Sequence, residues 1–397
     1  MKLRNQLLAL TCLLVFVALG AAYVRNVATS KPFGIILFVS DGMVARHLTA
    51  ARLYEGGADH RLAIDAFPHL AMVRNSASDF AVPDAASAGT ALATGRKVNH
   101  RRLSVDPNGE SLPTLFELAK EKSRSVGLIT NGRLTDPAPA AFYSHLPDSR
   151  DDTAIAGQFA SAKIDVALGG GADSFQPHEN DGDQSPDHLA AMQSRRMIVR
   201  TKAELENAAT YQETEILGLF SAAGMAHADQ IESGSQQPSL ADMVRRAIQF
   251  LETNRNGYLL VIDASLIDLA AGRNEGERVI QETATLDHAI ATAVKYAGEK
   301  SLICAVGKHA IGGMSLNGFP LRQDHGVAIL GVTPEGYPSI TWATGPTDSK
   351  SEPAAFQTPA AVNTAEDVIA IGRGPGAEKL QGFIENTAIF DLLREAL

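Results

Sequence analysis

The chain has 397 residues, 45% of them hydrophobic, which is enough for one large domain or two ordinary domains with a substantial core. Its formal net charge is -10, which argues against nucleic acid as a partner, because phosphate backbones attract basic surfaces. The two cysteines, Cys12 and Cys304, leave a single thiol beyond the first 24 residues and so exclude an internal disulfide there.

The first 24 residues have the pattern of an export segment. Lys2 and Arg4 precede an uncharged apolar run over residues 7–24, and Arg25 ends that run. A cleaved signal peptide has this charge pattern, while the run is also nearly as long as the roughly 20 apolar residues that span a bilayer. The sequence leaves both interpretations open. Either one places the rest of the chain in the periplasm or outside the cell, with any membrane contact limited to this segment, which would act as an inner-membrane anchor if uncleaved.

Residues 25–33 are interpreted as a linker, and residues 34–397 as a single domain in which strands alternate with helices. A continuous apolar run such as 34–40 is typical of a strand buried on both faces of a parallel sheet. The alternation predicts an α/β fold with a central, mostly parallel sheet sandwiched by helices. The polar stretch 173–236 is interpreted as an excursion on this sheet rather than a second domain. The other expected strands are 125–130, 258–262 and 301–306, and the expected helices are 112–122, 240–252 and 277–296.

Candidate site residues follow the expected strands. Ligand sites in open α/β sheets lie at the carboxyl ends of the strands. Asp41, Asp263, Asp268 and His309 all follow such ends in the sequence. We therefore expect them to share one edge of the sheet.

Several motifs occur in order from about Gly34 to the end of the chain. They are Ile35–Met43, Val82–Gly95, Thr135–His145, Leu168–Gly171, Pro238–Met243, Gly307–Gly318, Asn363–Val368, Gly374–Ala377, Phe383 and Glu385–Thr387. With these motifs the sequence is similar to the alkaline phosphatase family, whose members share the predicted fold and commonly form homodimers. The resemblance implies phosphomonoester hydrolysis by a serine nucleophile surrounded by two zinc ions and one magnesium ion.

The residue at the position that the resemblance assigns to the serine nucleophile cannot act as a nucleophile. The family serine follows an aspartate, and here Asp84 is followed by Ala85, with no gap through Thr94-Gly95. Alanine has no oxygen to phosphorylate. Ser87 is two residues further, which in a helix turns its side chain by about 200° away from the expected position. A hydroxyl in the first helical turn is the commoner role for such a serine.

The resemblance also leaves both zinc sites incomplete. At the first site Asp268 matches, but Gly272 and Asn363 stand where histidines are expected, and a catalytic zinc needs about three protein ligands. At the second site Asp41 and His309 match, but Lys308 replaces an aspartate. A protonated lysine cannot bind a metal ion and repels one. Lys308 either serves as a substitute cation beside the carboxylates or extends into solvent, and the sequence does not decide between these roles.

The magnesium position retains oxygen donors. Asp41 and Asp136 match the family, Asp263 replaces a glutamate, and Ala138 replaces a threonine or serine. Hard cations accept carboxylate ligands and complete their shells with water. One Mg²⁺ or another divalent metal therefore remains a candidate cofactor, whereas the zinc pair is expected to be lost. The alternative is that these aspartates are occupied by Lys308 and backbone amides.

These substitutions favour a pseudophosphatase, which is a member that keeps the fold of the family without its catalytic activity. Lys308 and Arg150 are the candidate ligands for a phosphate-like anion, although Arg150 lies one residue further from His145 than the resemblance implies. An exposed arginine without a ligand is the alternative for Arg150. Two other functions stay open: a metal-dependent phosphomonoesterase with a rearranged site, and a non-catalytic interaction partner built on the same fold.

Overall fold

The computed structural model describes residues 2–23, 31–40, 44–177, 186–210, 214–232, 234–348 and 351–397. The chain divides into two compact units, Met1–Pro32 and Phe33–Leu397. The first contains helix α1 (Lys2–Tyr23), in which Leu3–Gly20 is long and apolar enough to cross a membrane by length and composition. Most of the predicted linker, residues 25–30 of 25–33, lies outside the described residues.

The second unit is built on a ten-stranded sheet with the order β15-β2-β14-β8-β1-β7-β3-β4-β6-β5. Strand β14 runs antiparallel to both its neighbours, and every other pair is parallel, so the prediction of a mostly parallel sheet is confirmed. The strands are β1 (Gly34–Ser40), β2 (His69–Arg74), β3 (Ser125–Arg133), β4 (Val166–Gly170), β5 (Arg196–Val199), β6 (Glu215–Leu219), β7 (Tyr258–Ala264), β8 (Leu302–Gly307), β14 (Val368–Arg373) and β15 (Gln381–Glu385).

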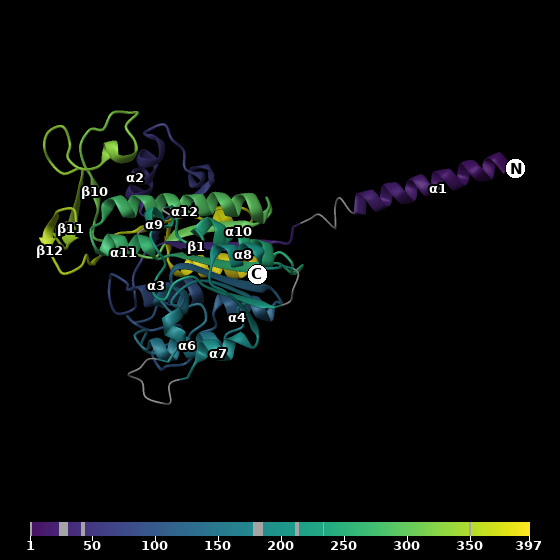
Figure 1. The fold of residues 1–397 in the computed structure, drawn as a ribbon, viewed down its shortest axis with the longest axis horizontal. Coiled ribbons are helices and arrows are strands. Elements are labelled where there is room, and N and C mark those ends of the chain that lie inside the picture. Colours follow the sequence, from purple (N-terminus) through teal and green to yellow (C-terminus); the bar gives the residue numbers. More distant parts are fainter. Residues whose placement is uncertain are drawn as a thin grey trace. The chain divides into compact units, whose positions relative to one another are not determined.

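Helices cover both faces of this sheet, as Figure 1 shows. On one face lie α2 (Ala45–Gly56), α10 (Leu240–Leu251) and α12 (Gly276–Ala297), and on the other lie α3 (Ala85–Thr94), α4 (Leu115–Glu121), α6 (Asp152–Ser161) and α13 (Thr387–Ala396). The remaining helices are α5 (Pro137–Ala140), α7 (His188–Gln193), α8 (Lys202–Asn207), α9 (Ala228–Glu232) and α11 (Leu266–Gly272), with single 3₁₀ turns at Ala63–Ala66, Ala172–Phe175, Gly326–Ile329 and Ala377–Lys379.

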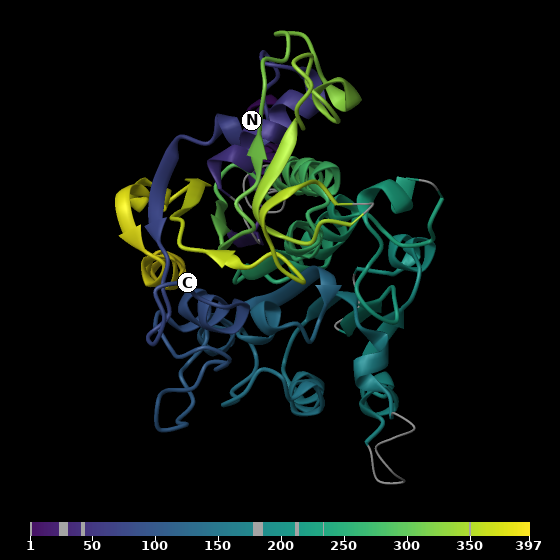
Figure 2. The same ribbon diagram turned by 90° about the vertical axis from the view of Figure 1, so that its left-hand side faces the viewer.

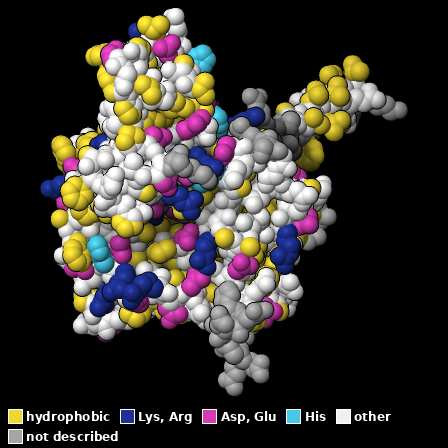
Figure 3. Space-filling model, turned by 60° about the vertical axis from the view of Figure 1, so that its left-hand side comes forward, with side chains coloured by type: hydrophobic (Ala, Val, Ile, Leu, Met, Phe, Trp, Pro, Cys, Tyr) yellow, Lys and Arg dark blue, Asp and Glu magenta, His cyan; other side chains and the backbone are white. Residues whose placement is uncertain are grey.

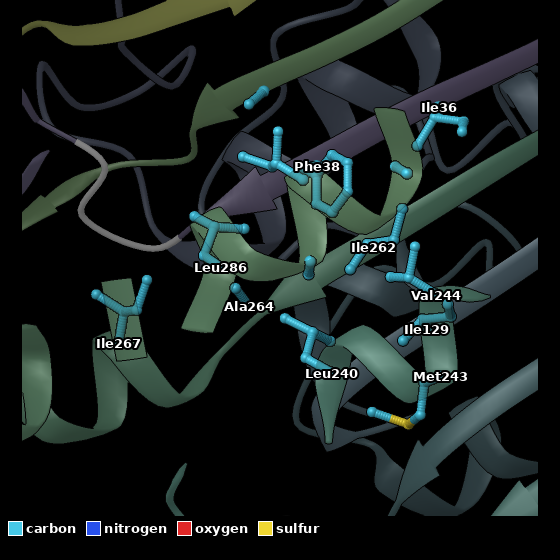
Figure 4. Close-up of a cluster of buried hydrophobic side chains, with 14 of the residues drawn as sticks. Ile36, Phe38, Ile129, Leu240, Met243, Val244, Ile262, Ala264, Ile267 and Leu286 are labelled. Atoms are coloured by element: carbon cyan, nitrogen blue, oxygen red, sulfur yellow. The ribbon is translucent and has the colours of Figure 1, made fainter. Parts of the chain in front are cut away.

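Strand β1 shows why a continuous apolar run is needed at the centre of the sheet. Successive side chains point to opposite faces, so Ile36 and Phe38 enter one hydrophobic core while Ile35 and Leu37 enter the other. Figure 4 shows Ile36 and Phe38 packed with side chains from α10 and β7, among them Val244. Both cores therefore depend on strands of this kind being apolar at every position.

Two smaller sheets follow β8. One consists of β10 (Ser315–Leu316), β11 (Ile340–Gly345) and β12 (Ala354–Gln357), and the other pairs β9 (Ala310–Ile311) with β13 (Asn363–Thr364). Figure 2 shows the segment between β10 and β11 projecting from the main body. The stretch 173–236, predicted to be an excursion, contributes β5 and β6 to one edge of the large sheet.

Candidate functional site

The carboxyl ends of β1, β3, β7 and β8 meet at one edge of the sheet and bring the predicted residues together. Asp263 is directly beside Val39 of β1 and Thr130 of β3 in the strand register. Thr130 Oγ1 donates to Asp263 Oδ2 over 2.9 Å, and Ser265 Oγ donates to the same oxygen. The carboxylate is thus buried and oriented by hydroxyls. Asp41, predicted to lie at this edge after β1, is outside the described residues.

Asp136 lies at the start of α5, close to Asp263. Its Oδ2 accepts a hydrogen bond of 2.7 Å from the backbone N–H of Arg133. Burial raises the pKa of the Asp136 carboxyl to about 6. The hydrogen bond from Arg133 opposes this shift, the negative charge of Asp263 adds to it, and the positive charge of Lys308 opposes it. Asp263 and Lys308 therefore lie close enough to Asp136 for their charges to affect the pKa of its carboxyl.

Asp268 lies in the first turn of α11, which follows β7. Burial raises the pKa of its carboxyl, the charge of Lys308 lowers it, and the charges of Asp263 and Asp136 raise it. Within the described part of the chain, the buried Oδ1 atom of Asp268 has no hydrogen-bond partner. Asp268 therefore belongs to the same acidic cluster as Asp136 and Asp263.

Lys308 and His309 follow β8 and are both buried, with 4% and 2% of their surface exposed. The backbone N–H of Lys308 donates to the carbonyl oxygen of Ser40 over 2.8 Å, and its own carbonyl oxygen accepts a hydrogen bond from Asn75 Nδ2. The alternative in which Lys308 extends into solvent is therefore wrong. Its ammonium group lies within electrostatic reach of the carboxylates.

A cavity of about 350 Å³ opens beside this cluster. Its lining includes Ala85, at the position that the resemblance assigns to the nucleophile, and Ala138, at the position of the magnesium-binding threonine. Among the described residues, Asp263, His309 and Arg150 do not line it. The lining residues are Ala85, Gly132, Arg133, Asp136, Pro137, Ala138, Gly224, Ser265, Leu266, Asp268, Leu269 and Lys308.

The Ser87 hydroxyl is bonded at the start of α3, and Ser87 is not among the described residues that line the cavity. Its Oγ donates to Asp84 Oδ1 over 2.7 Å, and the Ser87 N–H donates to the same oxygen over 2.9 Å. Asp84 is the N-cap of α3, and its own N–H donates to Ser87 Oγ over 3.2 Å, which makes the cap of the helix reciprocal. Ser87 is buried, and it caps the helix as the sequence favoured.

The structure does not bring Arg150 to the cavity. Its side chain is 69% exposed and forms an ion pair with Asp148, two residues away, with Nη2 and Oδ2 2.6 Å apart. The cavity is lined instead by Arg133, which binds Asp152 and Ser174. Sequence reasoning missed Arg133. Its position in the last residues of a strand is the signal that would have identified it.

The residues at the first zinc position do not supply the donors of a zinc site. Gly272 offers no side chain, and the nearest described atom to a Cβ placed there would be in Ile311, at 4.0 Å. The amide of Asn363 donates to the carbonyl oxygen of Pro83 over 2.9 Å, so this nitrogen is already bonded. Among the described residues, which exclude Asp41, no three His, Cys, Asp or Glu side chains are arranged to hold a metal ion.

Comparisons with known proteins agree with the fold and the motifs. The family model described as alkaline phosphatase matches residues 34–337. Alkaline phosphatase 4 of Bacillus subtilis is 28% identical over 91% of this chain and 88% of its own length, and the alkaline phosphatase of Escherichia coli is 25% identical over 95% and 88%. The alkaline phosphatase structure from Thermus thermophilus superposes with a TM-score of 0.76 at 22% identity, covering 93% of this chain and 92% of that one. The structure from the Antarctic bacterium TAB5 gives 0.73 at 23% identity, covering 92% and 97%. The chain therefore belongs to the alkaline phosphatase family, and it has the fold of that family.

Proposed function

We propose that this protein is a pseudophosphatase: a member of its family that does not hydrolyse phosphomonoesters and retains the cavity as a binding site. The observation that carries the proposal is the position of Ala85. It is the first residue of α3 and lines the cavity, where the resemblance assigns the serine nucleophile. A hydroxyl is the atom that a phosphoserine intermediate requires, and a methyl group cannot replace it.

The metal ligands support the same proposal. A zinc pair would clamp the attacking and leaving oxygens of the reaction. Gly272 and Asn363 provide no imidazole, and Lys308 places a positive charge beside Asp136 and Asp268. Because catalytic groups act as a unit, loss of the nucleophile together with several ligands leaves little rate enhancement.

We propose a phosphate-like anion as the ligand of the cavity. Lys308 supplies a buried positive charge, and the first turn of α3 begins at Ala85, where helix N–H groups favour negative charge. The carboxyl groups of Asp136 and Asp268 oppose an anion when ionised, and the raised pKa of each weakens that opposition. Arg133 replaces Arg150 as the arginine that lines the site.

The test is an assay of p-nitrophenyl phosphate hydrolysis by purified protein with added zinc and magnesium. We expect no turnover above that of the same protein in EDTA. The Ala85→Ser variant should stay equally inactive, because the hydroxyl alone lacks its activating metals. Metal-dependent turnover that disappears in an Asp136→Ala control would overturn the proposal. Inorganic phosphate should raise the melting midpoint of the wild-type protein and not that of Lys308→Ala.

A second candidate is an enzyme that uses one hard metal ion. Asp136 and Asp263 lie close enough for each charge to affect the other carboxyl, and oxygen donors suit Mg²⁺. Such an ion would be held by Asp41, Asp136 and Asp263 and would activate water for attack on the ester. Metal analysis after dialysis against excess magnesium or zinc distinguishes this candidate from the pseudophosphatase. A stoichiometric metal content supports it, and a metal-free protein contradicts it.

We also propose export and self-association. Helix α1 is compatible with a signal peptide or an inner-membrane anchor, and either one supports a location in the periplasm or outside the cell. Exposed apolar side chains on the projecting segment, visible at the top of Figure 3, provide a surface for a second copy and would support a homodimer. They are Phe319, Leu321, Val327 and Val332. Analytical ultracentrifugation tests the dimer. Co-purification of an active relative would favour the alternative, a non-catalytic interaction partner.

A further inference from the structure

A second cavity, of about 120 Å³, lies where the first turns of α9, α10 and α11 meet α12. Its walls are mostly apolar and include Met225, Leu240, Met243 and Leu266. Leu266 is the one residue, among those described, that also lines the cavity beside Ala85. The second cavity is therefore a separate space, and the proposed function does not use it.

A buried carboxylate belongs to the lining of this cavity. It is that of Glu282 in α12, a residue with 3% of its surface exposed. Its Oε1 accepts two hydrogen bonds, from Nδ1 of His227 over 3.0 Å and from the backbone N–H of Ala228 over 2.9 Å. No described residue forms a hydrogen bond with the other oxygen, Oε2. Because each carboxylate oxygen can accept hydrogen bonds, Oε2 is available to a ligand in the cavity.

The lining of the cavity offers little to balance the charge of Glu282. Among the described residues that line it, Glu282 is the one acidic side chain, and none is a lysine or arginine. A second proton on His227 would lie on Nε2, which is buried and has no hydrogen-bond partner in the described part of the chain. A neutral imidazole therefore suits this position. Since a buried carboxylate without a counter-charge is costly, the cavity favours a cation that also donates a hydrogen bond.

We propose that this cavity binds a small primary ammonium ion with a short aliphatic chain. The ammonium group donates to Glu282 Oε2, and the methylene groups pack against the apolar walls. An apolar cavity of about 150 Å³ in another protein holds a benzene molecule, so the space here limits the ligand to roughly four to six non-hydrogen atoms. A quaternary ammonium ion has no N–H group to donate and does not fit this description.

An outer cavity of about 360 Å³ provides a route to this site. The two cavities share Ala228, Thr285 and His288 in their linings, so they adjoin. The side chain of His288 is 60% exposed, and its Nε2 lies 3.2 Å from Glu55 Oε2. A ligand can therefore enter past an exposed side chain rather than through the hydrophobic core.

The test titrates the full chain with n-butylamine, which is protonated at neutral pH, and compares it with 1-butanol, an uncharged probe of the same length. NMR of protein labelled with ¹³C-methyl methionine follows the methyl signals of Met225 and Met243, which line the cavity. We expect butylamine to move both signals. Butanol should bind about tenfold or more weakly, because it cannot form a charge-assisted hydrogen bond with Glu282.

Two substitutions separate the carboxylate from the cavity walls. Glu282→Gln keeps the size of the side chain and removes its charge, and it should weaken butylamine binding about tenfold or more. Glu352→Gln is the matched control and should leave the affinity unchanged. Glu352 is half-buried, accepts hydrogen bonds from the N–H of Gly276 and from Trp342 Nε1, and is not among the described residues that line the cavity.

Equal affinity of the wild-type protein and Glu282→Gln for butylamine would overturn the proposal, because the apolar walls alone would then hold the probe. Methionine signals that stay unmoved at about 50 mM butylamine would also overturn it, since a ligand of this size is expected to bind in the millimolar range. If Glu282→Gln does not fold, Ala241→Leu decides, because it fills the cavity from α10. Loss of binding in that variant supports the site, and unchanged binding contradicts it. The test measures no hydrolysis, so this site and the proposed loss of activity can fail independently.

Discussion

Lys308 and Asp136 carry opposite charges where little water reaches either of them. The carboxyl of Asp136 has a pKa of about 6 instead of 3.8, mainly because of burial. The folded protein therefore holds this proton more tightly than the unfolded chain does. A raised carboxyl pKa stabilises the fold below the unfolded pKa, and this contribution is lost as the pH rises through about 6.

Substitution of this residue should remove that pH dependence. In Asp136→Asn the amide oxygen can still accept the N–H of Arg133, and no charge has to be buried. We expect its free energy of unfolding, relative to the wild-type protein, to increase between pH 4 and pH 7 by about 1–3 kcal/mol. Urea denaturation across this pH range measures the difference. A difference that stays constant with pH would mean that Asp136 does not titrate as described.

At the scale of a single element, helix α3 shows how the first turn is fixed beside the cavity. The bonds between Asp84 and Ser87 satisfy N–H groups that have no partner within the helix. At the other end, Gly95 adopts φ 68°, and a Cβ there would lie 2.5 Å from the ring of Phe390. Both ends of the helix are thus set by specific residues, which fixes where Ala85 lines the cavity.

The cap predicts the effect of removing the Ser87 hydroxyl. Ser87→Ala should lower the free energy of unfolding by about 0.5–1.5 kcal/mol, the range for loss of a hydrogen bond, because the Asp84 N–H loses Ser87 Oγ as its acceptor. Ser161→Ala is a matched control, because the exposed hydroxyl of Ser161 donates to the carbonyl oxygen of Gly157 one turn earlier. The control should change stability by less than about 0.5 kcal/mol. Equal effects in chemical denaturation would show that the cap contributes nothing specific.

At the scale of the whole molecule, the chain separates into an apolar N-terminal helix and a compact domain. Side chains of α1 such as Phe16 are 76% exposed, whereas both cores lie within the unit Phe33–Leu397. Exposed apolar surface of this extent favours binding to a membrane, or self-association in water. The stability of the domain should therefore not depend on α1.

A chain that begins at Phe33 should melt at the same midpoint as the full chain. It should also remain soluble without detergent, whereas the full chain should aggregate unless detergent covers α1. Differential scanning calorimetry and size-exclusion chromatography measure these two properties. A lower midpoint of the shortened chain would show that α1 packs on the domain.

Much of the fold could be predicted because it rests on local patterns. The continuous apolar run 34–40 predicts a central strand, and the observed strand β1 has those bounds and is buried along its whole length. The helix predicted over 240–252 is observed as Leu240–Leu251. The short strands β9 to β13 were not predicted, because pieces of two to six residues have too little periodicity to detect.

By itself, the sequence determined the family and the α/β class of the fold, because its motifs keep the order of the family and its apolar strand patterns alternate with helix patterns. Only the tertiary structure decided where side chains point. It buried Lys308 beside the cavity rather than extending it into solvent, left Arg150 exposed and brought Arg133 to the cavity. The physical reason is that the direction and burial of a side chain depend on strands and helices that are distant in the sequence and meet only in the folded sheet.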